Sequence, residues 1–365
     1  MLSNFNQPLR FDAFMQQALY HPEFGYYARG EAIFGSRGDF ITAPELSPLF
    51  GRTLAKAITD VLPLCNHTIY EFGAGTGRLA CDILTEAGEA IEQYCIVDLS
   101  GGLKATQQKS LESQLPPTLV SKVRWLTELP TSLSGVVIGN EVLDATPVRR
   151  FKWTAAQVDE AWVAPKNGEL CLTWQPAEPA FSDQVKRLEQ THGPWPNGYE
   201  SEIAQQAAGL IRTLTDRLQG LALMIDYGHH EALYYSPGRT QGTLRATSNH
   251  VAHDDFLSRP GEQDLTAHVN FSAMYEALVE CGGALEGYCH QGEFLLANGI
   301  LDLARENPLL TDPVAGATVR QRLNMLVSEA DMGLTFKVLA WSKGINIDHT
   351  ALRDVLLRHD RSAEL

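Results

Sequence analysis

The stretch IYEFGAGTGRLACDIL, residues 69–84, constrains the fold of this chain more than any other segment. Its apolar start is typical of a buried strand, and Arg78 opens a run typical of a helix. Between the two, Gly73, Gly75 and Gly77 recur at every second position. Glycines in such a turn let the backbone adopt positive φ and approach a ligand that a Cβ would exclude. The segment therefore predicts a strand, a tight loop and a helix that together hold a cofactor.

The spacing of these glycines bears on which cofactor is held. The third glycine follows the first by four residues, whereas the nicotinamide fingerprint G-x-G-x-x-G requires five. Glu71 stands directly before the turn, where its carboxylate can attract the cationic amino end of S-adenosylmethionine (SAM). A dinucleotide would instead bring its pyrophosphate to this place. The loop favours SAM over NAD, and the alternative is a glycine turn that only lets the helix pack on the strand.

Strands and helices alternate after this loop, which predicts an α/β fold. Apolar strand candidates cover residues 68–72, 94–98, 122–126 and 135–139, and helix candidates cover 78–90 and 103–115. Near-continuous apolar strands separated by helices are typical of a parallel, doubly wound sheet. Before the loop, the sequence predicts a helix in FDAFMQQAL and a second helix with Ser47 as N-cap and Pro48 at its first position.

The second half of the chain interrupts the alternation and then resumes it. Residues 151–174 contain two strand-like runs around an Asn167-Gly168 hairpin signal, and an amphipathic helix from residue 203 ends at Gly220. Strands follow at 221–226, 284–290 and 334–342, the last two as an antiparallel pair, with a loop-rich stretch at 229–268 and a helix at 271–281. We expect a seven-stranded, doubly wound sheet with cap insertions, divided as 1–62, 63–150, 151–220, 221–345 and a tail, 346–365.

Composition narrows the class of protein. The 365 residues carry a formal net charge of -15, which argues against a nucleic-acid partner and suits a basic substrate. No apolar run is long enough for a membrane span, and the first residues lack a signal or import pattern, so we expect a cytoplasmic protein. The six cysteines form no C-x-x-C pair, which predicts reduced thiols in the core and no zinc site.

Asp98 ends the second strand of the alternating region, in YCIVDLS. A carboxylate at this position can accept hydrogen bonds from both hydroxyls of an adenosine ribose. The alternative is an aspartate that caps the following helix. The glycine loop one βα unit earlier favours ribose binding, although this role would serve NAD as well as SAM.

A second polar cluster follows the fourth strand, where GVVIGNEVLDA places Asn140, Glu141 and Asp144. Ligands of open α/β sheets bind at the carboxyl ends of the strands, so this cluster is expected to face the reactive end of the cofactor. Two carboxylates three residues apart can bracket a guanidinium or ammonium group. The alternative is that Asn140 caps a helix and that both acids are solvated residues of its first turn.

Two further segments contain candidate ligand residues. The box GSRGDFITAPEL lies directly before the Pro48 helix, and its residues of interest are Gly35, Gly38, Asp39, Thr42, Pro44 and Glu45. The backbone amides of the helix start and the Thr42 hydroxyl can bind the carboxylate end of a ligand. The alternative is a turn and helix cap that bind no ligand. His250 and His253 resemble a metal pair, but no third ligand follows at a recognised spacing, so no metal site is predicted. His229 and His230 follow a strand end and could lie at the rim of the site.

Taken together, these segments closely resemble the MidA-type SAM-dependent methyltransferases. The matching boxes occur in the order of that family and cover residues 8 to 342; they are GDFITAPELSPLFG, EFGAGTGRLACDIL, YCIVDLS, NEVLDATPVRRF, LMIDYGHHEALYYSPGRTQGTLRA, HDDFLSRPGEQDLTAHVNF and EFLLANG. The boxes NEVLDA and SRPGEQDLTAHVNF are far more specific than the glycine loop. The insertion at 151–196 matches less well.

The resemblance implies a seven-stranded, Rossmann-like SAM-methyltransferase fold with an N-terminal helical segment and cap insertions, and it implies roles for particular residues. It implies that SAM is bound through Glu71 and the three glycines of the loop, with Asp98 on the ribose and with Thr42 and Asn140 in the pocket. Mitochondrial members of the family are protein arginine methyltransferases that modify a subunit of respiratory complex I. The resemblance therefore implies a protein substrate with an arginine acceptor, for which Glu141 and Asp144 are the catalytic candidates and Glu45 a reserve.

Three other functions are compatible with these residues. The chain could be a SAM-binding assembly factor with little turnover, a small-molecule N- or O-methyltransferase, or a nicotinamide oxidoreductase. The glycine spacing argues against the last of these. Without an import pattern the chain resembles a bacterial member of the family, so the substrate of the mitochondrial members need not carry over.

Overall fold

The computed structural model describes the whole chain except residues 1–4, 6, 29–41, 99–102 and 249–250. Its centre is a mixed sheet in which seven strands run in the order β15-β16-β10-β5-β2-β3-β4, with the short β14 (Val269–Asn270) added to β10. The seven strands are β2 (Thr68–Phe72), β3 (Gln93–Val97), β4 (Val123–Leu126), β5 (Leu133–Asn140), β10 (Leu218–His229), β15 (Ala284–His290) and β16 (Phe336–Lys343). This is the predicted doubly wound, seven-stranded fold.

The direction of the strands locates the site. Strands β4, β3, β2, β5 and β10 are parallel to one another, and β16 is antiparallel to both β10 and β15. The predicted antiparallel pair is thus confirmed. The chain proceeds outward from β2 to β3 and β4 on one side, then returns to add β5 and β10 on the other side of β2. The order reverses between β2 and β5, where ligands of open α/β sheets bind.

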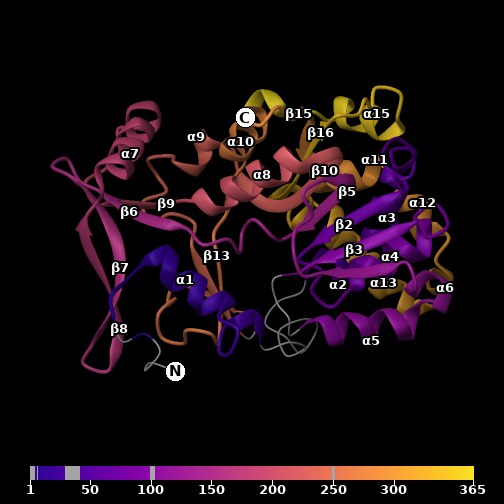
Figure 1. Ribbon diagram of the computed structural model, residues 1–365, viewed down its shortest axis with the longest axis horizontal. Helices are drawn as coiled ribbons and strands as arrows, with labels where there is room; N and C mark the ends of the chain where they lie inside the picture. The colour runs from indigo at the N-terminus through magenta and orange to yellow at the C-terminus, as the bar shows by residue number, and fades with distance from the viewer. Residues whose placement is uncertain (1–4, 6, 29–41, 99–102, 249–250) are drawn as a thin grey trace.

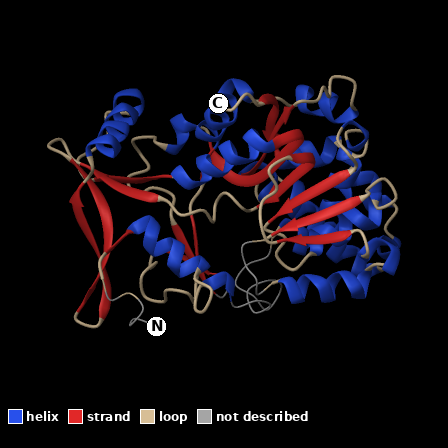
Figure 2. Cartoon of the chain, in the orientation of Figure 1, coloured by secondary structure: helices blue, strands red, loops and turns tan. Residues whose placement is uncertain are grey.

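Helices cover both faces of the sheet because alternate side chains of each strand point to opposite faces (Figures 1 and 2). In β10, Leu221, Leu223 and Ile225 enter one hydrophobic core, and Ala222 and Met224 enter the other. The first core includes helices α3 (Pro48–Ile58), α4 (Arg78–Ala87), α11 (Gln291–Ala297), α12 (Ile300–Arg305) and α15 (Ala351–Arg358). The second includes α8 (Gln205–Arg217) and α10 (Phe271–Glu280). Helices α2 (Ala43–Leu46), α5 (Lys104–Gln114) and α13 (Pro313–Val327) also contribute buried side chains to the first core, and partly buried side chains of α6 (Pro117–Val120) and α14 (Met332–Thr335) pack against it.

A second, antiparallel sheet lies apart from the central one, to the left in Figure 1. Its strands run in the order β1-β7-β6-β9, with β8 paired to β7, and are β1 (Leu9–Arg10), β6 (Arg149–Trp153), β7 (Val158–Lys166), β8 (Glu169–Pro176) and β9 (Tyr199–Ile203). The predicted hairpin is the turn between β7 and β8, where Asn167 and Gly168 both have positive φ (54° and 84°). Helix α7 (Pro179–His192) packs on β7.

The N-terminal segment joins both parts of the molecule. Strand β1 pairs with β7, and α1 (Phe11–Tyr20) packs against β6 and β7, between the two sheets in Figure 1. Farther along, α3 begins as predicted, with the Ser47 hydroxyl accepting a hydrogen bond from the backbone N–H of Leu49 (3.3 Å). Helix α3 then packs on α4 beside the glycine loop.

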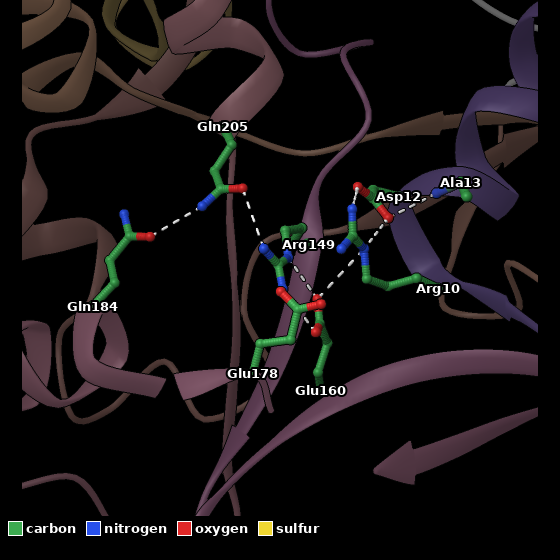
Figure 3. A network of polar contacts seen from close by, with 8 residues as sticks. All are labelled: Arg10, Asp12, Ala13, Arg149, Glu160, Glu178, Gln184 and Gln205. Carbon is green, nitrogen blue, oxygen red and sulfur yellow. Dashed lines mark hydrogen bonds and ion pairs between the residues drawn. The ribbon is translucent and has the colours of Figure 1, made fainter. Parts of the chain in front are cut away.

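An ion-pair network fixes α1 and the inserted sheet (Figure 3). Buried Arg149 donates two hydrogen bonds to buried Glu160 on the neighbouring strand, at 2.5 and 2.8 Å. Arg10 pairs with Asp12 at the start of α1 (2.7 Å) and lies 3.7 Å from the same Glu160 carboxylate. Arg149 also reaches Gln205 at the start of α8 (3.5 Å). The network thus links the inserted sheet to α1 and α8, two helices that supply Tyr20 and Leu210 to the cavity described below.

Two details differ from the sequence-based predictions. Gly220 does not end α8: the helix ends at Arg217, and Gly220 lies inside β10 opposite Gly135. A Cβ on Gly220 would lie 1.9 Å from the carbonyl oxygen of Gly135, so close approach of two strands explains this glycine. The loop-rich stretch 229–268 contains α9 (Glu231–Tyr234) and a small sheet of β11 (Arg245–Ser248), β12 (Val251–His253) and β13 (Asp264–Thr266). Strands this short leave no clear alternation in the sequence.

Candidate active site

A cavity of about 450 Å³ lies at the carboxyl ends of the parallel strands, at the reversal between β2 and β5. Nine of the ten residues predicted for the site line it, namely Thr42, Glu45, Glu71, Gly73, Gly75, Asp98, Asn140, Glu141 and Asp144. The tenth, Gly77, does not. Segments that are nearly 100 residues apart in the sequence therefore meet around one space.

The glycine loop adopts the backbone that its composition predicts. Gly73, Gly75 and Gly77 have φ of 66°, 52° and 81°, which side-chain-bearing residues rarely adopt. A Cβ on Gly73 would meet the Val142 side chain at 3.0 Å. Gly77 serves the packing of the helix, because a Cβ there would lie 3.2 Å from the Cα of Gln107 in α5. Gly73 and Gly75 thus line the cavity, whereas Gly77 packs inside the protein.

Glu71 is the carboxylate beside this loop. It is buried and accepts a hydrogen bond from the Tyr94 hydroxyl at 2.8 Å. Burial and the charge of nearby Asp98, opposed by this hydrogen bond, raise the pKa of Glu71 to about 8. A cation at the cavity end of Glu71 would favour its charged form.

Asp98 is held by Gln107, a residue that sequence reasoning did not identify. The Gln107 amide donates to the Asp98 carboxylate (2.7 Å) and to the carbonyl of Gly75 (3.1 Å), and its oxygen accepts from the Trp125 indole (2.9 Å). One side chain therefore sets the spacing between the loop and Asp98. Asp98 is not the cap of the next helix, because the N-cap of α5 is Leu103.

The turn after β5 is organised by Asp226 at the end of β10. One Asp226 carboxylate oxygen accepts hydrogen bonds from the backbone N–H groups of Val142, Leu143 and Asp144, at 2.9 to 3.2 Å. Glu141 adopts a positive φ of 52° in this turn. Strain of this kind in a residue other than glycine persists only where the surrounding contacts enforce it. Only the fold reveals this role of Asp226, since 82 residues separate it from Asp144.

The side chains of the same turn face the cavity. The Asn140 amide donates to Glu141 at 3.1 Å, and no helix follows, so Asn140 is not a helix cap. The backbone N–H of Ala43 in the N-terminal segment also donates to Glu141, at 3.4 Å. Among the residues that the structure describes, the Asn140 Oδ1 and Asp144 Oδ1 atoms have no hydrogen-bond partner, although both are buried. Buried acceptors without donors are costly, so these two atoms indicate a place for a donor from a ligand.

The carboxylates of this turn repel one another. Burial, followed by the charge of Asp144, raises the pKa of Glu141 to about 8. Burial raises the pKa of Asp144 to about 6, opposed by a hydrogen bond from Tyr227. Burial and the charges of Asp144 and Glu141 hold the pKa of Asp226 well above its usual value. A cation bound here would relieve this repulsion.

A family profile described as "Putative S-adenosyl-L-methionine-dependent methyltransferase" matches residues 50–289 of the chain. The chain belongs to this family. A SAM-dependent methyltransferase activity and SAM as cofactor, both predicted from the sequence, are confirmed by this membership. The glycine spacing thus distinguished SAM from a nicotinamide cofactor correctly.

Solved structures from Burkholderia thailandensis agree with the methyltransferase fold. A crystal structure of a proposed methyl transferase bound to S-adenosyl-homocysteine has a TM-score of 0.90 and 39% sequence identity, covering 98% of this chain and 93% of its own. A native crystal structure of an uncharacterized protein from the same organism has a TM-score of 0.88 and 39% identity, covering 98% and 92% of the two chains. The fold predicted from the sequence is therefore confirmed.

Curated relatives support the resemblance to MidA-type methyltransferases and correct one prediction. The protein arginine methyltransferase NDUFAF7 homolog of Caenorhabditis elegans is 28% identical over 370 residues, covering 92% of this chain and 82% of the relative. Human NDUFAF7 is 28% identical over 376 residues, covering 91% and 80%. Both relatives are mitochondrial by name, which contradicts the predicted cytoplasmic location. That prediction used the lack of an import pattern in the first residues and of a long apolar run, whereas these relatives match over most of the chain.

The N-terminal segment of the methyltransferase contacts the site at two points. The Glu45 carboxylate accepts a hydrogen bond from the Thr76 hydroxyl in the glycine loop, and Ala43 reaches Glu141 as described. Thr42 lines the cavity and makes no side-chain cap bond to α2. Gly35, Gly38 and Asp39 lie outside the described residues.

The histidine candidates lie elsewhere. His250 is outside the described residues, and His253 lies 3.3 Å from the Ser248 hydroxyl. No group of three or more metal-binding side chains occurs in the described part of the chain. His229 and His230 do not line the cavity; His229 lies 3.1 Å from His268, whose ring packs edge-on against Tyr227.

No helix in the described ranges is long and apolar enough to cross a membrane.

Sequence reasoning missed the opposite end of the cavity. This end is formed by side chains from α1 and the segment after it, from the end of β10 and from the small sheet, namely Tyr20, Tyr27, Tyr227, Thr247, Asp264 and Thr266. Two matching boxes were the sequence signals for this part of the site: LMIDYGHHEALYYSPGRTQGTLRA contains Tyr227, and SRPGEQDLTAHVNF contains Asp264 and Thr266.

Proposed function

We propose that this methyltransferase transfers the methyl group of SAM to an arginine side chain of a protein substrate. The observation that carries the proposal is the pair of carboxylates, Glu141 and Asp144, that faces the same cavity as the glycine loop. The names of the curated relatives, which are protein arginine methyltransferases, support the same acceptor.

The residues at the glycine loop fit SAM. Gly73 and Gly75 leave room for the methionine end, Glu71 offers a charge to its amino group, and Asp98 accepts from the ribose hydroxyls. The unpartnered Asn140 Oδ1 and the Thr42 hydroxyl complete the set of groups for the cofactor. When bound, SAM supplies a methyl group that its sulfonium has already activated, so the protein mainly has to position the acceptor. Such positioning can supply on the order of 7–11 kcal/mol of the barrier.

An arginine acceptor presents one difficulty, because its guanidinium stays protonated up to a pKa above about 12. Two carboxylates can hold two of its nitrogens and draw the positive charge toward them, which leaves the third nitrogen more nucleophilic. One carboxylate can then accept the proton that leaves after transfer. Glu141 and Asp144 have the position for these roles, and Glu45, tied to Thr76, stays the reserve candidate.

The acceptor can be identified directly. Lysate from a strain that lacks the gene is incubated with purified enzyme and methyl-labelled SAM, and the labelled species are identified by mass spectrometry. We expect label on arginine nitrogens of a protein, and none with a Glu141→Gln enzyme. Label on a small molecule or on another atom would contradict the arginine proposal, and the absence of any label would favour an assembly factor that binds SAM without turnover.

A further inference from the structure

Helix α5 turns one amide side chain into the interior of the protein. The helix is largely polar, and the two side chains that it buries are Gln107 and Leu111. Gln107 is 0% exposed, which is uncommon for a glutamine. Burying an amide is costly unless hydrogen bonds satisfy it, so the partners of Gln107 indicate why the residue is there.

The partners of Gln107 allow only one orientation of its amide. The Trp125 indole in β4 can only donate, and it does so to the Gln107 oxygen at 2.9 Å. The Gln107 nitrogen therefore faces two acceptors, the Asp98 carboxylate at 2.7 Å and the carbonyl of Gly75 at 3.1 Å. An amide turned by 180° would place its oxygen against both acceptors and its N–H groups against the indole donor. Trp125 thus determines that Gln107 donates toward the cavity wall.

The bond from Gln107 fixes Asp98 without using up its capacity as an acceptor. Asp98 directly follows the last residue of β3 and lines the cavity. A carboxylate has about four lone-pair sites for hydrogen bonds, so it can accept from Gln107 and from ribose hydroxyls together. A bond of 2.7 Å to a charged acceptor is of the strong, charge-assisted kind. Gln107 therefore sets the direction in which the Asp98 oxygens point.

The third glycine of the loop permits this arrangement. A Cβ on Gly77 would lie 3.2 Å from the Cα and 3.4 Å from the Cβ of Gln107, so a side chain there would push α5 away from the loop. Gly77 does not line the cavity. The close approach of Gln107 therefore explains why the loop has a glycine at this position.

We propose that Gln107, oriented by Trp125, is a positioning residue that holds the Asp98 carboxylate against the ribose of SAM and fixes its distance from the glycine loop. This inference rests on the role of Asp98 in the proposed function and deepens it by naming the residues that make this contact selective. Gln107 and Trp125 do not line the cavity, so they act through Asp98 and Gly75 and not by touching the cofactor.

The test uses variants of the full-length protein. Gln107→Met keeps the length of the side chain and removes its hydrogen bonds, and Trp125→Phe keeps an aromatic ring but removes the N–H that orients the amide. Gln108→Met is the matched control, because Gln108 is the next residue of the same helix but is exposed and bonds Glu112 at 2.8 Å. Thermal unfolding verifies that each variant is folded.

The readout is the affinity of two ligands, measured by calorimetry. One is S-adenosyl-homocysteine, and the other is its 2′,3′-dideoxy analogue, which lacks both ribose hydroxyls. We expect the wild-type protein to bind the first at least about tenfold more tightly, as expected for hydrogen bonds to a charged group. Gln107→Met should weaken S-adenosyl-homocysteine binding by about tenfold and change the affinity of the analogue little. Trp125→Phe should have a smaller effect of the same kind, and Gln108→Met should have none.

A double variant shows whether Gln107 acts through Asp98. Asp98→Asn should itself remove most of the preference for the ribose hydroxyls. If Gln107 acts through this carboxylate, adding Gln107→Met to Asp98→Asn should cost little further affinity for S-adenosyl-homocysteine. Losses that simply add would overturn the positioning role.

The outcomes separate this inference from the proposed function. A wild-type protein that binds both ligands equally would overturn the role of Asp98 in the proposed function, and the inference with it. A wild-type preference for the hydroxyls, together with equal weakening of both ligands in Gln107→Met, would overturn the positioning role alone. If Gln107→Met does not fold, the same comparison in Trp125→Phe decides: loss of S-adenosyl-homocysteine affinity alone supports the role, and equal or no loss for both ligands overturns it.

Discussion

Single residues at the reversal of the sheet decide what the cavity can bind. Gly73 and Gly75 have backbone angles that exclude most side chains, and Asn140 and Asp144 present acceptor atoms without described partners. Gly73 and Gly75 leave space for a ligand, and Asn140 and Asp144 present acceptor atoms to which a ligand can donate hydrogen bonds. Together they explain why a cationic nucleoside and a cationic acceptor suit one space.

At this scale the first prediction concerns Gly75. Gly75→Val places a branched side chain at a φ of 52° against the cavity, so SAM binding should be lost. Calorimetry with SAM measures the effect. Gly238→Val is the control, since a Cβ on Gly238 meets no atom within 4 Å and the residue lies outside the cavity. Unaltered SAM affinity in Gly75→Val would contradict the assignment of the loop.

The second prediction concerns Glu141. Glu141→Gln should leave SAM affinity nearly unchanged and lower turnover by about a hundredfold or more, the effect of removing one preorganised electrostatic contact to the transition state. The measurement pairs calorimetry with initial rates at saturating SAM. Weakened SAM binding with normal turnover would reassign Glu141 to the cofactor site.

The third prediction is the pH dependence of the reaction. The pKa of Glu141 is raised to about 8 and that of Asp144 to about 6, so each carboxyl group is neutral below its value and gains its charge as the pH rises. Because both charges hold the guanidinium, kcat/KM should rise from about pH 5 to about pH 9, in steps near pH 6 and pH 8, and then level off. Initial rates across this range check the profile, and Glu141→Gln should lose the step near pH 8. A profile that falls over this range would exclude charged carboxylates as the acceptor contacts.

At the scale of elements, α1 and the small sheet of β11 and β13 bring residues to the cavity that the central sheet cannot supply. Helix α1 ends at Tyr20, a cavity residue, and its start is tied to the Arg149–Glu160 pair through Arg10 and Asp12 (Figure 3). Arg149 also lies over the Phe181 ring, 3.9 Å from its centroid. The position of α1 thus depends on charges buried some distance from the chemistry.

The fourth prediction tests this network. Glu160→Gln leaves Arg149 buried without its counter-charge, which should lower the free energy of unfolding by about 3–5 kcal/mol. Glu178→Gln is the control, because Glu178 is 3.8 Å from Arg149 and its side chain is 70% exposed, so its effect should stay within about 0.5 kcal/mol. Denaturant unfolding measures both. Equal stability of the two variants would show that the network does not hold α1.

At the scale of the whole molecule, charge and topology act together. The net charge of -15 surrounds a cavity whose acceptor end is itself acidic. A basic segment of a substrate would be attracted at long range and then held at short range by Glu141 and Asp144. The topology brings β13 next to the turn after β5, although the two lie far apart in the sequence. Ala267, which follows β13, donates a backbone hydrogen bond to the carbonyl of Asp144 in that turn.

The fifth prediction follows from this charge. The KM for a basic protein acceptor should increase when salt is raised from about 0.05 to 0.3 M, because salt screens attraction between separated charges, while kcat should change little. Steady-state rates at several salt concentrations test it, with potassium chloride and potassium glutamate compared to exclude an effect of one anion. A KM independent of salt in both would show that long-range attraction plays no part.

The sequence by itself determined the sheet, the cofactor and nine of the cavity residues. It could do so because these features are local: apolar periodicity defines strands such as β2 and β5, glycine spacing defines the loop, and polar residues at strand ends must gather at one edge of a parallel sheet. Tertiary structure alone decided the roles of Asp226 and Gln107. Each of them acts on a residue from another element, and hydrogen bonds between distant segments leave no pattern in a single sequence. The same reason explains Gly220, whose local context resembles a helix end although the neighbouring strand requires the glycine.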